Sequence, residues 1–168
     1  TADTSVGATD RILLGQRFEG FNVQGLAKGT SAAKSVTLSF WVKSNKTGTY
    51  IVELFDSPNS RQVSKAYTID SANTWEYKTI TYPADTTGVF ANNNSLTLLV
   101  QFWLAAGSDY TSGTLNTSWA ANTNANRAVG QVNLADSTSN YLNITGVQLE
   151  VGSTATPFEN LQYETQLA

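Results

Sequence analysis

Two tryptophans offer the clearest chemistry in this sequence. Trp41 and Trp103 each lie in an apolar run whose side chains alternate in type, and each ring belongs to the polar set, opposite the aliphatic one. A flat ring beside amide, hydroxyl and charged groups is suited to stack on a sugar while the polar groups bond its hydroxyls. The predicted ligand or interface face comprises Trp41, Trp103, Gln101, Lys43, Gln148 and Glu150.

The sequence leaves three interpretations of these two rings open. The rings can be covered by the loops and tail of their own domain, which needs no partner. They can anchor a subunit interface, where Trp and Tyr are favoured residues. They can also bind a ligand, because large exposed aromatic side chains are otherwise uncommon.

A long polar segment, residues 106–128, contains two more aromatic residues, Tyr110 and Trp119. Loops longer than about 12–15 residues in compact domains often serve a function. Ordering such a loop without an anchor is entropically costly, so we expect these rings to pin the loop to the domain. An exposed binding platform is the alternative.

The composition argues against catalysis. Histidine and cysteine are both absent, which excludes Ser-His-Asp triads and metal sites built on His or Cys. The carboxylates form no recognisable paired signature, and a small β-sandwich rarely supplies a deep cleft. We therefore expect no catalytic residues and a protein that is not an enzyme.

Two loops are rich in oxygen ligands of the kind that calcium prefers. One combines Asp85 with residues 92–94, and the other combines Asp136 with Asn140. Neither has the spacing of an EF-hand. We expect these acids to be solvated loop residues and the protein to need no cofactor, with a structural calcium ion as the alternative.

The overall charge and hydropathy exclude two classes of partner. The 168 residues carry a net charge of −3 without a basic run, so nucleic acid is not an expected partner. No apolar run approaches 18 residues, so no membrane insertion is expected. Charged residues make up only 14%, against about 25% in ordinary soluble domains. This profile is typical of an uncharged surface of strands and turns.

The element expected to organise the fold is the strand at residues 35–44, which would turn Val36, Leu38, Phe40 and Val42 toward a core. Turn signals separate it from several further strand patterns, and no convincing helical period appears. The other expected strands cover residues 16–26, 49–56, 62–69, 74–82, 95–105, 129–134 and 141–151. The pattern predicts an all-β fold, an antiparallel two-sheet β-sandwich of the jelly-roll type with about eight strands.

The chain is expected to form one sandwich domain with an extension at each end. Residues 1–15 form an N-terminal arm or tether that ends in an apolar hook at residues 12–14. Residues 16–152 form the sandwich. Residues 153–168 form a partly apolar tail that packs on the domain or on a neighbouring subunit.

Several segments together resemble a module common in bacteriophage virion proteins, notably tail fibres. They are Val36–Ser44 with Thr47–Tyr50, Thr74–Ile80, Leu104–Ser108, and Ile144–Gly152 followed by Ala155–Glu159. The last of these is the most specific. The resemblance implies a jelly roll similar to carbohydrate-binding modules, often near the end of a trimeric fibre, and it brings no catalytic residues.

The expected protein is therefore a structural component of the virion exterior, a tail-fibre or receptor-binding module that contacts host surface glycans. Its expected partners are its own copies, as a homo-oligomer and specifically a trimer, other virion proteins, and host surface polysaccharide. A capsid decoration (cement) protein is the alternative, favoured by the apolar hook and the apolar tail. A secreted carbohydrate-binding module attached to an enzyme is a third interpretation.

Overall fold

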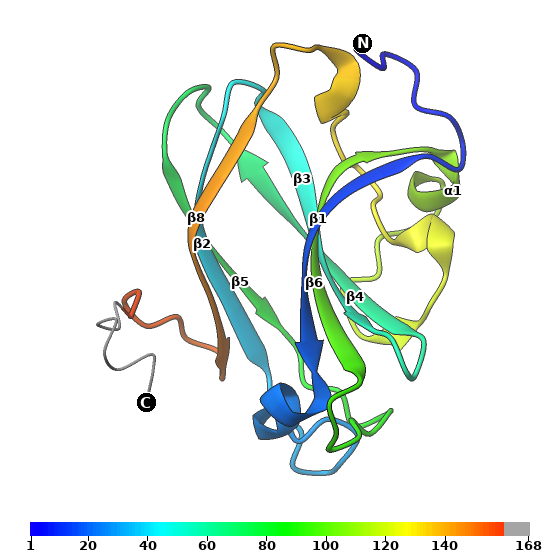
Figure 1. Cartoon of the computed structure of the whole chain (residues 1–168), viewed down its shortest axis with the longest axis vertical. Helices are drawn as coiled ribbons and strands as arrows, with labels where there is room; N and C mark the ends of the chain where they lie inside the picture. Colours follow the sequence, from blue (N-terminus) through cyan, green and yellow to red (C-terminus); the bar gives the residue numbers. More distant parts are fainter. Residues whose placement is uncertain (160–168) are drawn as a thin grey trace.

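Two antiparallel sheets packed face to face make up the molecule (Figure 1). The computed structural model describes residues 1–159. The larger sheet has the strand order β1-β6-β3-β4-β7, and the smaller has the order β5-β2-β8. The strands are β1 (Arg11–Glu19), β2 (Val36–Ser44), β3 (Gly48–Asp56), β4 (Arg61–Ile69), β5 (Glu76–Tyr82), β6 (Leu96–Ala106), β7 (Ala120–Ala121) and β8 (Leu142–Val151). The predicted all-β sandwich with about eight strands is confirmed.

Short helices connect the strands. They are the 3-10 helices η1 (Gly20–Leu26), η2 (Asn124–Asn126) and η3 (Leu134–Asp136), and the single-turn α-helix α1 (Ser108–Thr111). In the described part of the chain, no helix has the length and apolar character to cross a membrane.

The first strand differs from the prediction. β1 begins at Arg11, so residues 11–15, expected in an arm, belong to the sheet and pair with β6. Residues 20–26, expected to belong to the strand at 16–26, form η1 instead. Gly20, where the chain leaves the sheet, lies against the backbone of residues 91–93, and only glycine fits there because a Cβ atom would be 2.0 Å from the Ala91 carbonyl oxygen. The short strand expected at 129–134 is replaced by loop that leads into η3.

The core lies between the sheets and follows the predicted alternation along β2. Val36, Leu38, Phe40 and Val42 are all buried in it. Phe40 contacts Phe102 of β6 and Tyr67 of β4 edge to face, with ring centres 5.1 and 5.2 Å apart. Such pairs add to the stabilisation from buried area, so Phe40 joins the two sheets.

Buried charges at one end of the sandwich are all paired. The Lys28 ammonium lies 2.5 Å from Asp56 and 3.0 Å from Asp85, and Arg61 donates two hydrogen bonds to Asp85. The same ammonium lies 4.9 Å from the ring centre of Trp119. Separating a buried ion pair leaves a charge without a partner, which is costly. The network therefore favours the one arrangement of the surrounding loops in which these charges stay paired.

This network predicts loss of stability in acid. Burial alone would raise the pKa of Asp85, but hydrogen bonds from Arg61 and Lys28 outweigh it and lower that pKa. A lowered folded pKa stabilises the protein above the unfolded value, about 3.9 for Asp, and this contribution is lost as pH falls through the folded pKa. We expect the free energy of unfolding, measured with urea from pH 7 to pH 2, to fall below about pH 4.

Asp85→Asn serves as the comparison variant for this measurement. Its unfolding free energy should change less steeply between pH 4 and pH 2, because one linked carboxylate is gone. The slope should not vanish, since hydrogen bonds from Lys46 and Thr156 also lower the pKa values of Asp136 and Glu150. Equal slopes in the two proteins would contradict the assignment to Asp85.

Candidate functional site on the three-stranded sheet

The outer face of the smaller sheet carries Trp41, as predicted for this residue. Strand register places Trp41 between Tyr77 of β5 and Thr145 of β8. The ring centres of Trp41 and Tyr77 are 5.3 Å apart with a 46° tilt. Trp41 is 44% exposed and Tyr77 is 45% exposed. The two rings form a contiguous aromatic surface that remains open to solvent in the described structure.

Trp75 extends this surface from the residue just before β5, and it too is largely exposed. The Lys43 ammonium lies 5.6 Å from the centre of its ring. Attraction between an ammonium group and an aromatic face at an exposed site is worth about 0.5–1 kcal/mol. Lys43 therefore helps to hold Trp75 in place, and its charge lies at the border of the aromatic surface.

A bulge in β8 brings a fourth ring to the same face. Gly146 has φ +58° where the register of β8 shifts against β2, a conformation that favours glycine. A Cβ atom at Gly146 would lie 3.4 Å from Cδ1 of Trp41 and 3.8 Å from the Phe158 ring. These are ordinary contact distances, so the positive φ and not the space around Gly146 accounts for the glycine, and both rings lie beside this bulge. We call Trp41, Trp75, Tyr77 and Phe158 the aromatic face.

Two predicted polar members of the face, Gln148 and Glu150, are engaged by the chain that follows β8. Thr156 donates its hydroxyl and its backbone N–H to Glu150, and Gln148 accepts the backbone N–H of Glu159. The hydrogen bonds from Thr156 lower the pKa of Glu150. These two side chains position residues 156–159 and hence Phe158, so they shape the aromatic face from its edge.

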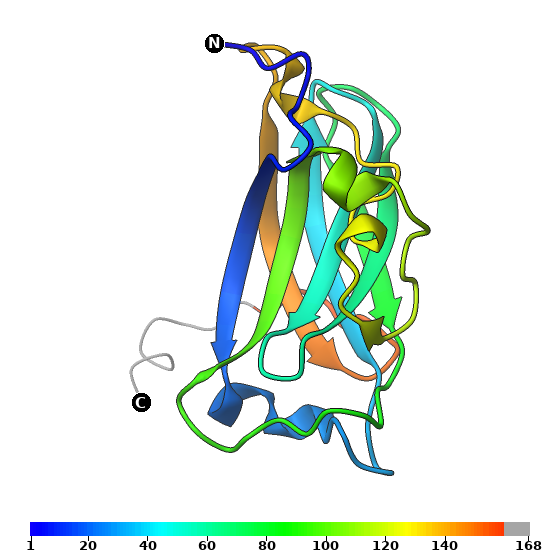
Figure 2. The same cartoon turned by 90° about the vertical axis from the view of Figure 1, so that its right-hand side faces the viewer.

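The prediction that Trp41 and Trp103 belong to one face is wrong. Trp103 belongs to β6 of the larger sheet, whose outer face is on the opposite side of the sandwich. Residues 107–132 cross that side (Figure 2), and Trp103 is 0% exposed. It packs with Ile51, Ala128 and Tyr110, whose ring centre lies 5.3 Å away. Trp103 thus forms a second small core and not a ligand face.

The loop aromatics and Gln101 all make contacts within the domain, Tyr110 and Gln101 near the second core and Trp119 at the main core. Tyr110 is buried against Trp103, and Gln101 accepts a hydrogen bond from Arg127 at 3.2 Å. Trp119 packs against the main core, and its indole N–H donates to the Pro83 carbonyl at 3.0 Å. These contacts are those of residues that anchor a long loop, so neither Gln101 nor the loop aromatics join Trp41.

The two loops considered for calcium hold their carboxylates in other contacts. Asp85 is paired with Lys28 and Arg61. Asp136 is paired with Lys46 and accepts a hydrogen bond from Asn140 at 2.7 Å. Over residues 1–159, no three metal-ligating side chains of the Asp, Glu, His or Cys type lie close enough to hold one ion.

Sequence reasoning missed three members of the aromatic face, Trp75, Tyr77 and Phe158. For the first two a signal was present: Trp75, Tyr77 and Thr79 are spaced by two, so they share one side of an extended segment. What the spacing could not supply was the pairing of β5 with β2, which are separated along the chain by β3 and β4. Phe158 depends on the turn after β8 and had no local signal.

The aromatic face combines properties that suit it to bind a flat, hydroxyl-rich molecule. Its rings are partly exposed and adjacent, and its border carries the Lys43 ammonium and the exposed hydroxyls of Thr79 and Thr145. Patches of exposed rings rimmed by polar groups mark sites of interaction.

Comparisons of the chain with protein-family models, with curated proteins and with solved structures find no match.

Proposed function

We propose that this chain is a non-enzymatic module of a phage virion exterior that binds carbohydrate of the host surface through the aromatic face. The observation that carries the proposal is that four aromatic side chains, each between 42% and 49% exposed, lie on the outer side of one three-stranded sheet. The resemblance of the strand segments to phage tail-fibre modules supports the phage context.

The physical basis of the proposal is the match between the face and a sugar ring. The apolar C–H surface of a pyranose can lie on Trp41 and Tyr77, which touch each other and so offer a continuous surface. Lys43, Thr79 and Thr145 border these rings and can bond hydroxyl groups. Burying both rings against a ligand removes apolar area from water, at roughly 25 cal/mol per Å².

The double variant Trp41→Ala/Tyr77→Ala should bind carbohydrate much more weakly than the native chain. Loss of the stacking surface should raise the Kd at least about tenfold, which corresponds to about 1.4 kcal/mol. The measurement is biolayer interferometry against a panel of immobilised bacterial surface polysaccharides, using the polysaccharide that the native chain binds most tightly.

Phe21→Ala is the matched control, because Phe21 is also exposed but lies in η1, at the end of the sandwich. It should leave the Kd unchanged, and circular dichroism should show the same fold in all variants. The proposal fails if the native chain binds nothing on the panel, or if the double variant binds as tightly as Phe21→Ala.

A homo-oligomer, specifically a trimer placed at a host-contacting fibre, is part of this proposal and rests on the same resemblance. Capsid decoration is the second candidate. It is favoured by apolar side chains exposed along β1 and β8, such as Leu14 and Val147, which suit a protein surface better than a sugar. Immunogold labelling of purified particles distinguishes the two, since label at fibre tips supports attachment and label on capsid faces supports decoration.

A further inference from the structure

Lys28 and Asp56 bring an amine and a carboxyl group into contact inside the protein. Nζ of Lys28 lies 2.5 Å from Oδ2 of Asp56, and the two side chains are only 4% and 0% exposed. The ring centres of Phe90 and Trp119 lie 5.0 and 4.9 Å from the same nitrogen. Two charges in such surroundings have lost their hydration, so a reaction that turns the pair into a neutral amide removes a cost that remains while they are ions.

The carboxylate of Asp85 touches the same amine. Its Oδ2 lies 3.0 Å from Nζ of Lys28, and Arg61 holds the carboxylate in place with hydrogen bonds of 2.8 and 3.0 Å. The carbonyl oxygens of Thr87 and Gly88 accept hydrogen bonds from Nζ at 2.8 and 3.0 Å and hold the amine in this position. Because the pair of Asp85 and Arg61 is neutral as a whole, Asp85 stays ionised when Lys28 loses its charge. Asp85 is therefore placed to take a proton from the amine.

Asn59 holds the carboxyl group of Asp56 from the other side. Oδ1 of Asp56 accepts the backbone N–H of Asn59 at 3.1 Å, and the side-chain amide of Asn59 donates to both carboxyl oxygens at 3.0 Å. Hydrogen-bond donors aimed at the oxygen on which negative charge develops stabilise a tetrahedral intermediate. The two donors on Oδ1 therefore suit attack by Nζ of Lys28 on Cγ of Asp56, with Oδ2 as the leaving oxygen.

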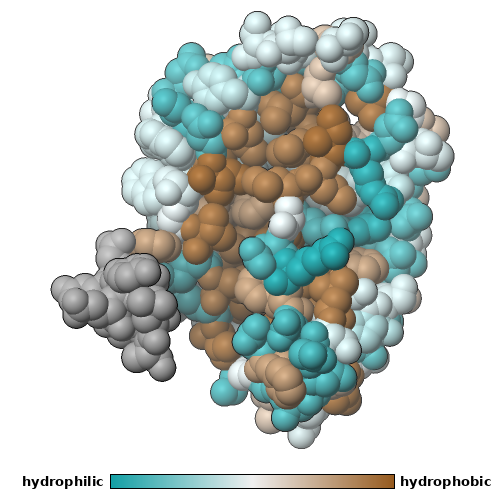
Figure 3. All heavy atoms as spheres, viewed as in Figure 1, coloured by the Kyte–Doolittle hydropathy of each residue, from teal (hydrophilic) through white to brown (hydrophobic). Residues whose placement is uncertain are grey.

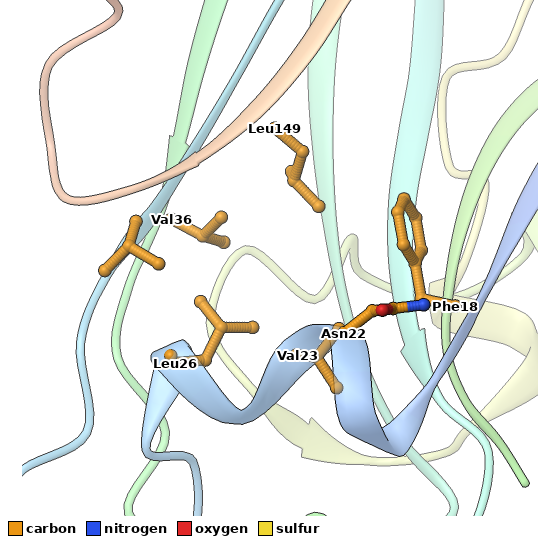
Figure 4. Close-up of a pocket in the computed structure, with 8 residues that line it drawn as sticks. Phe18, Asn22, Val23, Leu26, Val36 and Leu149 are labelled. Carbon is orange, nitrogen blue, oxygen red and sulfur yellow. The ribbon is translucent and has the colours of Figure 1, made fainter. Parts of the chain in front are cut away.

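The segment that carries Lys28 is fixed on both sides. Before it, Val23 and Leu26 of η1 pack into the main core, and they line a cavity of about 100 Å³ at this end of the sandwich (Figure 4). After it, Gly29 donates its backbone N–H to the Asp85 carbonyl at 2.9 Å. Well-oriented groups within one molecule react as if at concentrations on the order of 10⁵–10⁸ M. Lys28 and Asp56 thus meet the geometric condition for a reaction between them.

We propose that Lys28 and Asp56 condense to an isopeptide bond within the folded chain, with Asp85 as the proton carrier. In the ion pair, Nζ first passes one proton to Oδ2 of Asp56, which leaves a neutral amine and a neutral carboxyl group. The lone pair of Nζ then forms a bond to Cγ, and an electron pair of the Cγ–Oδ1 double bond moves onto Oδ1.

The intermediate breaks down with the loss of one water molecule. Asp85 takes a second proton from Nζ and delivers it to Oδ2 of Asp56. The electron pair on Oδ1 then restores the carbonyl, the Cγ–Oδ2 bond breaks, and Oδ2 leaves as water with two of the three protons of the ammonium. Nζ of Lys28 keeps the third as an amide N–H. No atom is oxidised or reduced, and no co-reactant is required.

The bond would fasten a connection between the two sheets. Lys28 lies between β1 of the larger sheet and β2 of the smaller sheet, and Asp56 is the last residue of β3. On the side where β1 and β8 face each other, the described structure has an apolar groove of about 470 Å³, and Figure 3 shows hydrophobic surface between polar margins there. A covalent link between the β1–β2 connection and β3 resists separation of sheets that are open on this side. It does not depend on carbohydrate binding.

Trypsin digestion of the native chain, denatured after it has folded, locates the bond. Trypsin cleaves after lysine and arginine, but not after a lysine whose Nζ belongs to an amide. We therefore expect one branched product, residues 18–34 joined to residues 47–61, whose mass is that of the two peptides less one water molecule. Tandem mass spectrometry identifies the two joined residues, and intact-mass measurement shows the same loss of water from the whole chain.

Lys46 and Asp136 provide a control within the same chain. They also form an ion pair, but their side chains are 25% and 35% exposed, and Asp136 is the only carboxylate that contacts the Lys46 amine within residues 1–159. Trypsin should cleave completely after Lys46. Complete cleavage after Lys28 as well would overturn the proposal, even if the chain had lost water, because an aspartate that cyclises onto its own backbone loses water too. An amide at Lys46 would also overturn it, since burial and Asp85 would then not select the reacting pair.

The role of Asp85 is tested by the rate at which the bond forms. Chains recovered unfolded in urea are refolded by dilution, sampled over time and digested, with circular dichroism to show that each has folded. Asp85→Asn should form the bond at least about a hundredfold more slowly, the usual loss when a proton-transfer group is removed. Asp85→Glu keeps a carboxylate and should react faster than Asp85→Asn. Equal rates in the native chain and Asp85→Asn, or no advantage of Asp85→Glu, would overturn the role of Asp85. If a variant does not fold, the digest of the native chain still decides whether the bond exists.

Discussion

Replacing Trp103 with alanine will lower the free energy of unfolding by about 3–5 kcal/mol, the usual cost of truncating a buried large aromatic residue. Trp103 has no solvent-exposed surface and fills the space between β6 and the segment that covers it. Its loss removes the contact with Tyr110 and leaves the Arg127 guanidinium, now 5.3 Å from the indole centre, beside a cavity. Urea denaturation followed by circular dichroism measures the change.

Trp41→Ala is the matched control, because it deletes the same side chain from a position that is nearly half exposed. Substitutions at exposed sites usually change the free energy of unfolding by no more than about 0.5 kcal/mol. Trp41→Ala should therefore unfold at nearly the native urea concentration and differ from the native chain in binding alone. Similar losses of stability in the two variants would contradict the division between a buried and an exposed tryptophan.

These two tryptophans also show what alternation in a sequence can and cannot predict. The pattern correctly placed both rings opposite the aliphatic side of their own strands, as the buried Leu38 and Phe40 of β2 and Phe102 of β6 confirm. It could not state which sheet each strand joins. Nor could it show which segment packs on the outer face of that sheet. Trp103 is covered by residues from 107–132, which follow β6 in the chain.

The start of the chain illustrates a second limit. Residues 11–15 include three consecutive apolar residues, Ile12, Leu13 and Leu14, which hide the period of two on which strand prediction depends. In the structure Leu13 packs toward Trp103, while Leu14 lines an apolar opening between β1 and β8, so both sides of the strand meet apolar residues at this position. Within residues 12–14 apolar and polar types therefore do not alternate, and the start of the strand leaves no signal of this kind.

Replacing Arg127 with methionine should also lower the free energy of unfolding by about 3–5 kcal/mol, as expected when a buried ion pair loses one partner. Arg127 donates two hydrogen bonds of 2.9 Å to the fully buried carboxylate of Glu53. Its guanidinium also lies 4.8 Å from the centre of the Phe55 ring. Methionine retains much of the apolar packing, so the loss isolates the charge left on Glu53.

The double variant Glu53→Gln/Arg127→Met tests the origin of that loss. Burial raises the pKa of Glu53 against the opposing effect of Arg127, so a carboxylate without its guanidinium is the costly species. Glutamine has a similar shape without the charge, so the double variant should be more stable at pH 7 than Arg127→Met alone. If adding Glu53→Gln lowers stability further, the destabilisation comes from lost packing of the covering loop and not from a stranded charge.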